Sequence, residues 1–322
     1  MMRGDERPAN GERSGPIGVA TLVRAVPPPR PSAWRIAWAL LRCRQWLKNT
    51  FVFAGLLFGG RLDEPAALAA AAVAFVAFSL LASATYIHND IVDRAVDRRH
   101  PTKRARPIAA GTISVRIARL IELGLLAAGA VAGALLGRSA LLLLVAYVAL
   151  NLAYNVVLKR IVLLDVFAIA AGFVLRVEVG CVAVGVVPSV WILLCTFVLS
   201  LLLGFGKRRH ELVLAGPSAY DHRPALGGYS TAFLDQMIGV TSASTIACYA
   251  MFTVWPGTLA AHGTDKLFWT VPFVLYGLFR YQLLVYTEGR GDDPTELVFT
   301  DRPLMATLLL WLLACVAILY WR

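Results

Sequence analysis

The sequence predicts an all-α integral membrane protein with about nine transmembrane helices. Its 322 residues are 58% hydrophobic and only 16% charged, whereas a soluble domain carries about 25% charged residues. Apolar stretches recur along the chain, separated by short polar connections. Each approaches the ~20 residues that a helix needs to cross a membrane. Lys and Arg gather in alternate connections, as expected of a chain that crosses a membrane repeatedly.

The first of the predicted transmembrane segments is the least apolar. Arg42, Arg44 and Lys48 occupy its first half, so we expect it to begin at the membrane interface and to become lipid-like from Thr50. No internal sequence repeat relates the segments. The nine segments cover residues 36–59, 65–88, 114–136, 139–158, 161–180, 189–206, 233–255, 267–287 and 303–321.

The distribution of Lys and Arg predicts the orientation, because cytoplasmic loops carry an excess of both. With the N-terminus inside, 25 of these residues fall on the inner side and 4 on the outer side. We therefore expect a cytoplasmic N-terminus and a C-terminus outside. The same clustering accounts for the net charge of +11, which is not interpreted as a sign of nucleic-acid binding.

The N-terminal residues 1–33 differ in composition from the rest of the chain. They are rich in Gly, Pro and Arg and contain no apolar run, which argues against a cleavable signal peptide and predicts a disordered cytoplasmic tail. Residues 34–322 then form one transmembrane catalytic domain. The five cysteines form no CxxC pair, so we expect them to be small buried apolar residues.

An acidic motif at the inner end of the second segment is the strongest chemical signal. Because a helix turns ~100° per residue, Asn89, Asp90, Asp93 and Asp97 would fall within an arc of roughly 100°. Three carboxylates on one stripe repel each other unless a cation joins them. Mg²⁺ prefers hard oxygen ligands and often keeps substrate phosphates in its shell. The motif therefore predicts a magnesium site that binds a diphosphate; the alternative is a solvated acidic helix end.

Basic side chains of four inner connections supply possible phosphate ligands. The stretch 100–108 follows the acidic motif directly, and a metal on one side of a phosphate with Arg and Lys on the other suits a phosphate leaving group. Each connection could instead be a topology signal or bind anionic lipid. The candidate residues in these connections are Arg44, Lys48, Lys103, Arg106, Tyr154, Lys159, Lys207 and Arg208.

Two ionisable residues lie within the fifth segment, where charges are costly and indicate function. Asp165 and Arg176 are eleven residues apart, which places them within ~20° of the same helix face. Both could face a cavity. The alternatives are a structural ion pair or an interfacial position for Asp165.

The acidic motif resembles the NDxxDxxxD motif of the UbiA-type intramembrane prenyltransferase superfamily. The second motif of that superfamily, DxxxD after the sixth segment, is absent, and residues 207–211 stand in its place. This replacement is similar to the branch of decaprenyl-phosphate phosphoribosyltransferases. The resemblance runs from about residue 40 to the C-terminus and includes residues 44–49, 100–111, 206–208, 211–212 and 301–302.

The resemblance implies a UbiA-like helix bundle with a cytoplasmic-facing active-site cavity in a bacterial inner membrane. The implied reaction transfers the 5-phosphoribosyl group of phosphoribosyl diphosphate to a polyprenyl (decaprenyl) phosphate, for an arabinan precursor of the cell wall. Mg²⁺ on Asp90, Asp93 and Asp97 would hold the departing diphosphate. No general base is implied, since the acceptor phosphate is already ionised. Candidate ligands of the donor and acceptor phosphates are Lys103, Arg106, Lys159, Lys207 and Arg208.

Two other functions stay open. A prenyltransferase would use a prenyl diphosphate with an aromatic or lipid acceptor, but such enzymes carry the second acidic motif that is missing here. A transporter of a phosphorylated metabolite would use the basic residues as its anion site, but three adjacent carboxylates would not help it without a metal. The sequence also leaves open whether the protein forms a homo-oligomer.

Overall fold

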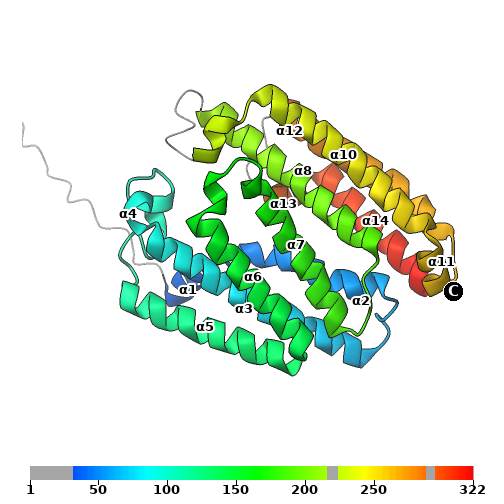
Figure 1. The fold of residues 1–322 in the computed structure, drawn as a ribbon, viewed down its shortest axis with the longest axis horizontal. Coiled ribbons are helices and arrows are strands. Elements are labelled where there is room, and N and C mark those ends of the chain that lie inside the picture. Colours follow the sequence, from blue (N-terminus) through cyan, green and yellow to red (C-terminus); the bar gives the residue numbers. More distant parts are fainter. Residues whose placement is uncertain (1–31, 216–223, 288–293, 322) are drawn as a thin grey trace, which may run out of the picture.

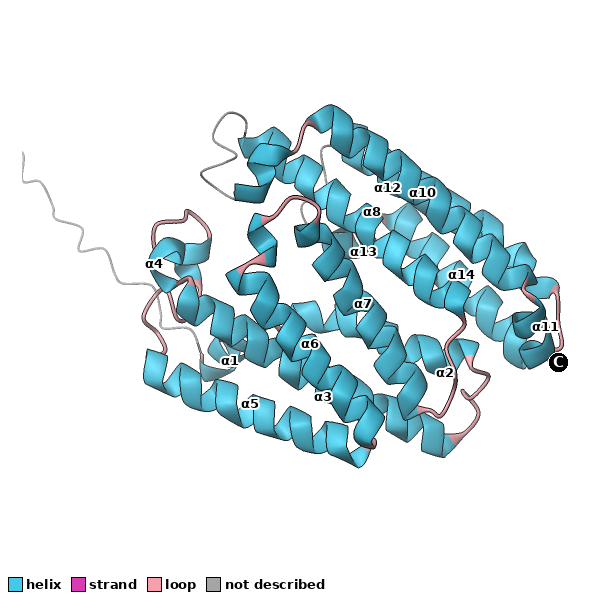
Figure 2. Ribbon diagram, viewed as in Figure 1, coloured by secondary structure: helices cyan, strands magenta, loops and turns pink. Residues whose placement is uncertain are grey.

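A computed structural model of the chain describes residues 32–215, 224–287 and 294–321, and every regular element in these ranges is a helix (Figure 2). The predicted tail of residues 1–33 lies outside the described residues except for its last two positions. The all-α prediction is confirmed.

Eight helices in the described ranges are long and apolar enough to cross a membrane, close to the nine expected. Most of the predicted segments agree with an observed helix to within a few residues. The eight helices are α3 (Pro65–Val92), α5 (Val115–Leu135), α6 (Arg138–Val156), α7 (Leu164–Ala183), α8 (Val190–Ala215), α10 (Thr231–Val254), α12 (Val271–Thr287) with the preceding 3₁₀ helix η6 (Lys266–Thr270), and α14 (Arg302–Tyr320).

The first predicted segment, 36–59, is not one helix. It consists of α1 (Ala33–Leu41), a 3₁₀ helix η1 (Cys43–Phe53) and α2 (Ala54–Phe58). The break lies at Arg42, whose φ of 51° and ψ of 47° are left-handed and cannot continue a right-handed helix. Further short helices lie within the connections between the long ones: α4 (Arg94–Asp97), α11 (Pro256–His262) and α13 (Pro294–Thr300), with the 3₁₀ helices η2 (Lys103–Ala105), η3 (Leu158–Arg160) and η5 (Pro224–Gly228).

Helix α7 joins two packed groups of helices (Figure 1). On one side its Val179 packs with η1, α3 and α6 around Phe78. On the other side its Val166 packs with α8, α10 and α12 around Leu202. Close packing of η1 requires Gly180, because a Cβ there would lie 1.9 Å from the carbonyl oxygen of Val52. The outward faces of α5 and α14 expose large aliphatic side chains, as lipid contact requires.

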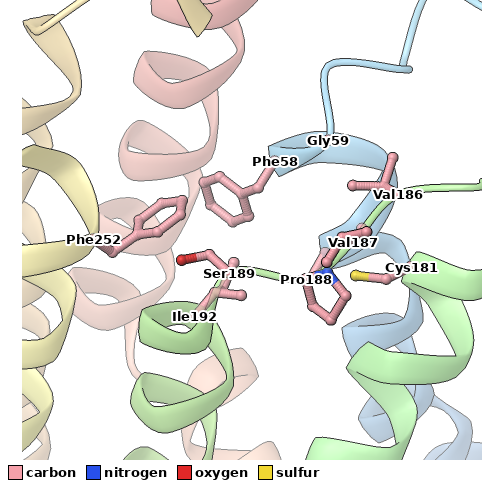
Figure 3. Close-up of a pocket in the computed structure, with 11 residues that line it drawn as sticks. Phe58, Gly59, Cys181, Val186, Val187, Pro188, Ser189, Ile192 and Phe252 are labelled. Atoms are coloured by element: carbon pink, nitrogen blue, oxygen red, sulfur yellow. The ribbon is translucent and has the colours of Figure 1, made fainter. Parts of the chain in front are cut away.

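The two ends of the bundle differ chemically. At one end, called the charged end below, lie α4, the connections on either side of it, the start of α7 and the last turns of α8 (Figure 1). At the other end a small apolar recess of about 30 Å³ lies between Phe58, Cys181, Pro188 and Phe252, with Ser189 as its polar side chain (Figure 3). A space of this size holds about one or two water molecules, so it is too small for a nucleotide or a polyprenyl chain.

Candidate active site

The acidic motif spans a break in the backbone. Helix α3 ends at Val92, and the backbone N–H of Asp93 donates to the carbonyl of Asn89 at 2.8 Å. Asp93 then starts the single turn α4, because its carbonyl accepts from Val96 and Asp97. The four residues therefore do not share one continuous helical stripe, contrary to the spacing argument, which assumed uninterrupted ~100° steps.

Two of the carboxylates nevertheless converge on one guanidinium. Nη1 of Arg106 lies 3.1 Å from Oδ1 of Asp90 and 2.7 Å from Oδ2 of Asp97. The side chains of Asp90 and Asp97 are only 3% and 4% exposed. Burying two carboxylates is costly unless each is paired, and Arg106 pairs both. The turn at Asp93 thus brings Asp97 back beside Asp90.

Arg42 is a second cation at the same carboxylate, and the sequence did not single it out. Its Nη2 forms an ion pair and hydrogen bond with Oδ1 of Asp90, and its guanidinium lies 4.9 Å from the ring centroid of Tyr86. In the sequence Arg42 is one of three similar basic residues. Arg42 is itself the left-handed residue after α1, and its side chain reaches Asp90 on α3. Nothing in the sequence distinguishes Arg42 from Arg44 or Lys48 in this respect.

The loop that carries Arg106 is held by other arginines through backbone carbonyls. Nε of Arg94 donates to the carbonyl of Ile108 at 3.3 Å, and Nε of Arg98 donates to that of Ala109 at 3.0 Å. Ile108 is fully buried against α1, α3 and α5. The loop is therefore held by one residue at the start of α4 and one just after its end, and these contacts fix the position from which Arg106 reaches the carboxylates.

Asp93 faces a different cation from its neighbours. Its Oδ1 lies 3.6 Å from Nζ of Lys159 on η3. The two side chains are 39% and 25% exposed, and such ion pairs near the surface contribute little stability. Asp93 thus joins the connection after α6 to the acidic motif while remaining accessible.

Asn89 supplies an observation that bears on the predicted metal. Its Oδ1 is buried and has no hydrogen-bond partner within the described part of the chain; an orphaned buried acceptor of this kind needs an explanation, such as an ion. With the carboxylates of Asp90, Asp93 and Asp97 it makes a set of hard oxygen donors of the type Mg²⁺ prefers. The described residues contain no cluster of three acidic, His or Cys groups already arranged as a metal cage. The donors therefore fit a divalent cation by chemistry, with two of them now occupied by arginine.

A second buried cluster joins α7 to α8. The polarity of residues 207–211 suggested a loop. Helix α8 instead extends past residue 206 to Ala215, so these residues lie on a helix. Nε of Arg208 lies 2.8 Å from Oδ2 of Asp165; the N–H does not point along this line, so the contact is an ion pair and not a hydrogen bond. Nη1 of Arg208 donates to Glu211. Arg208 is fully buried.

Tyr229 completes this second cluster. Its hydroxyl donates to Oδ1 of Asp165 at 2.7 Å and accepts from the backbone N–H of Leu163, also at 2.7 Å. Burial, followed by the hydrogen bond and the charge of Asp165, raises the pKa of Tyr229 above its ordinary value. The phenol therefore stays protonated as a donor. No sequence signal linked Tyr229 to Asp165, 64 residues away.

Arg176 does not contact Asp165, although the two share a helix face by spacing. Nε of Arg176 donates to Oδ1 of Asn49 at 2.9 Å, and its other nitrogens donate to the carbonyl of Gly172 and the hydroxyl of Tyr147. The rings of Phe78, Tyr147 and Phe173 surround the guanidinium at 4.8–5.0 Å. The two residues are ~16 Å apart along the helix and belong to separate clusters.

The remaining predicted substrate ligands lie on η1, η2, α6 and α8. Arg44 on η1 and Lys103 on η2 are exposed, whereas Lys48, Tyr154 and Lys207 are half-buried and have contacts of their own. Tyr154 lies near enough to Arg208 for the two to interact electrostatically. Their binding of substrate stays a prediction.

Comparison with known proteins shows the family to which this helix bundle belongs. Residues 49–301 match the UbiA prenyltransferase family, and the chain belongs to that family. Among its relatives, the decaprenyl-phosphate phosphoribosyltransferase of Corynebacterium glutamicum is 34% identical over 288 residues, 87% of this chain and 85% of that protein. The enzyme of the same name from Mycobacterium tuberculosis (strain CDC 1551 / Oshkosh) is 33% identical over 277 residues, 84% and 90% of the two chains.

Solved structures support the same fold. A UbiA homologue from Archaeoglobus fulgidus bound to GPP and Mg²⁺ has a TM-score of 0.69 at 19% identity, covering 88% of this chain and 99% of that one. An apo UbiA homologue from Aeropyrum pernix K1 has a TM-score of 0.58 at 20% identity, covering 86% and 98%. At these identities the likeness establishes the architecture alone.

Proposed function

We propose that this protein transfers the 5-phosphoribosyl group of phosphoribosyl diphosphate to a polyprenyl phosphate, such as decaprenyl phosphate, and releases diphosphate. The similarity to decaprenyl-phosphate phosphoribosyltransferases, which extends over most of both chains, carries this proposal. The helix at residues 207–211 agrees with it, because basic residues stand where a prenyl-diphosphate enzyme would carry its second acidic motif.

The described residues can supply what this chemistry needs. The bond between C1 of the ribose and the diphosphate oxygen breaks, and a bond from C1 to an oxygen of the acceptor phosphate forms. Mg²⁺ would neutralise the charge that collects on the leaving diphosphate, and Asp90, Asp93 and Asp97 with Asn89 are the residues that would hold it. Arg106 and Lys159 stand beside those carboxylates. No general base is required, since the acceptor is already an anion.

The membrane setting of the reaction is part of the proposal. We place the charged end and the N-terminus in the cytoplasm, where the Lys and Arg bias puts them, and the C-terminus on the other side of a bacterial inner membrane. Transfer onto a membrane-bound polyprenyl phosphate would then yield a precursor for cell-wall arabinan.

A transfer assay tests the reaction. Purified protein in lipid nanodiscs is incubated with ribose-labelled phosphoribosyl diphosphate, decaprenyl phosphate and Mg²⁺, and the lipid fraction is extracted. We expect label in the lipid, none without the acceptor, and none after EDTA. Label that stays in the aqueous phase, while a parallel reaction consumes geranylgeranyl diphosphate, would replace this proposal with prenyl transfer.

Sidedness has its own test at Ala95, an exposed residue of α4. In a variant whose five cysteines are replaced, Ala95→Cys should resist an impermeant maleimide in intact cells and react in inverted vesicles. A cysteine at exposed Gly257 of α11, at the opposite end of the bundle, should show the reverse pattern. Labelling of Ala95→Cys from outside intact cells would exclude the proposed orientation.

A further inference from the structure

The carboxylate–arginine cluster, defined here as Asp90, Asp97, Arg42 and Arg106, is electrically balanced. Two carboxylates face two guanidiniums, and both arginines contact the same oxygen, Oδ1 of Asp90. The acidic side chains are almost fully buried. A buried cluster of zero net charge lacks the negative potential that attracts a bare divalent cation.

Adding a metal to this cluster would upset the balance. Charges of the same sign repel each other more strongly inside a protein than in water, because the effective dielectric constant is lower there. A divalent cation placed among these carboxylates would therefore be opposed strongly by Arg42 and Arg106. A cation that arrives with a diphosphate brings its own negative charge, and the diphosphate oxygens are good partners for displaced guanidiniums.

The two arginines are placed so that such an exchange is possible. The side chains of Arg42 and Arg106 are 24% and 30% exposed, and each stems from a break or a loop and not from the middle of a transmembrane helix. Arg208, by contrast, is 1% exposed and lies within α8. Asn89, the neighbour of Asp90 in sequence, carries a buried Oδ1 without a hydrogen-bond partner among the described residues.

We infer that Arg42 and Arg106 are exchange groups that make metal binding depend on the diphosphate. Without donor they neutralise Asp90 and Asp97 and keep affinity for free Mg²⁺ low. When the donor arrives with its metal, the carboxylates pass from the guanidiniums to the metal, and the guanidiniums pass to diphosphate oxygens. This inference rests on the metal site of the proposed function and adds an order of binding to it.

Metal binding without catalysis tests the inference. Equilibrium dialysis of Mn²⁺ against the protein in nanodiscs, with and without inorganic diphosphate, measures the metal affinity directly. For the wild type we expect weak binding of Mn²⁺ alone and at least about tenfold tighter binding with diphosphate. Arg106→Gln removes the charge and retains an amide donor, so its affinity for Mn²⁺ alone should rise by about tenfold, equivalent to ~1.4 kcal/mol. Its gain from diphosphate should shrink.

Three further variants separate charge from loop damage. Arg106→Lys keeps the charge and should resemble the wild type. Arg42→Gln approaches the same carboxylate from another segment and should also tighten Mn²⁺ binding, which covers the case in which Arg106→Gln fails to fold. Arg98→Gln loosens the same loop through the carbonyl of Ala109 without removing the charge of Arg106, and should tighten Mn²⁺ binding much less than Arg106→Gln does.

The inference is overturned if neither glutamine variant at Arg42 or Arg106 binds Mn²⁺ more tightly than the wild type, or if Arg98→Gln tightens it equally. Dialysis uses neither a phosphoribosyl donor nor a lipid acceptor. A failed transfer assay with tighter Mn²⁺ binding in Arg106→Gln would therefore reject the proposed reaction and retain the exchange, and the reverse result would reject the exchange alone.

Discussion

The two buried Asp–Arg clusters use the same chemical groups in different settings. Asp90 pairs with arginines that are partly exposed and stem from irregular backbone, next to an orphaned acceptor on Asn89. Asp165 pairs with Arg208, which is fully buried within a continuous helix, and a tyrosine hydroxyl satisfies its other oxygen. The inferred exchange would let the carboxylate of Asp90 pass from arginine to a metal ion, whereas the carboxylate of Asp165 is enclosed by other side chains.

This difference leads us to expect a binding role for the cluster of Asp90 and a structural role for the contact between Asp165 and Arg208. Asp165 and Arg208 join α7 to α8 through a buried ion pair, although Oδ2 of Asp165 and Nε of Arg208 also lack a hydrogen-bond partner among the described residues. This ion pair thereby sets the position of Lys207, the next residue on α8. The substrate roles of Asp165 and Arg208 stay predictions, as does the role of Asp90 as a metal ligand.

The largest expected effect is on activity, in the first cluster. Asp90→Asn keeps the size of the side chain and removes one hard anionic ligand. We expect phosphoribosyl transfer to fall by ~100-fold or more, since electrostatic stabilisation of the leaving group is lost, while the melting temperature in detergent changes little. Asp93→Asn and Asp97→Asn should behave alike.

The matched control is Asp165→Asn, the same substitution in the second cluster. It should lower the melting temperature and leave the rate per folded molecule much closer to wild type. Near-normal turnover in all three variants of the acidic motif would remove the metal site from this region. Equal loss of activity in Asp90→Asn and Asp165→Asn would show that the two clusters do not differ in role.

The next effect is on stability, in the second cluster. Arg208→Met leaves Asp165 buried without its cation, and breaking such a pair costs ~3–5 kcal/mol. We expect a large fall in melting temperature and in the yield of folded protein. Adding Asp165→Asn should recover much of the loss, because the remaining buried charge is removed. A double variant no more stable than Arg208→Met would contradict this assignment.

A smaller effect is expected at Lys207. If its ammonium binds a substrate phosphate, the charge-assisted hydrogen bond contributes ~1.5–3 kcal/mol, about ten- to a hundred-fold in affinity. Lys207→Ala should raise the apparent KM for phosphoribosyl diphosphate or for polyprenyl phosphate by that factor, with little change in the Mg²⁺ requirement. Initial rates against each substrate and against Mg²⁺ decide this. A raised Mg²⁺ requirement alone would assign the helix to the metal side, and unchanged kinetics would leave Lys207 a topology signal.

The sequence was sufficient for most of the fold. Hydropathy identified all eight long helices because the bilayer requires ~20 apolar residues wherever the chain crosses it. It did not reveal that residues 36–59 are broken by a left-handed residue and a 3₁₀ helix, because hydropathy reports how apolar a segment is and not its backbone conformation. It also ended the sixth segment too early, because a helix can continue past the membrane once its residues become polar, as α8 does at Lys207.

The sequence was less informative about the site, since pairing depends on contacts between distant segments. It indicated Asp90, Asp97 and Arg106 as candidate site residues but not Arg42, which pairs with Asp90. The spacing of Asp165 and Arg176 suggested a shared cavity, whereas each is bound by residues of other helices. Helical periodicity predicts which way a side chain points; it contains no information on which neighbour it meets.

The smallest expected effect concerns Tyr229, which encloses Asp165. Tyr229→Phe removes one hydrogen bond to the carboxylate, worth ~1 kcal/mol or slightly more for a charged acceptor, so the melting temperature should fall by a few degrees. The raised pKa of Tyr229 determines how the difference in melting temperature between wild type and Tyr229→Phe depends on pH.

Between pH 6 and 9 the phenol is protonated in the folded and in the unfolded protein, so this difference should be constant. Above the ordinary tyrosine pKa of about 10, only the unfolded wild type releases this proton. The wild type then loses its advantage as pH rises, and the two melting temperatures should converge. A difference that varies between pH 6 and 9 would mean that Tyr229 ionises there, and that Asp165 is less enclosed than its contacts indicate.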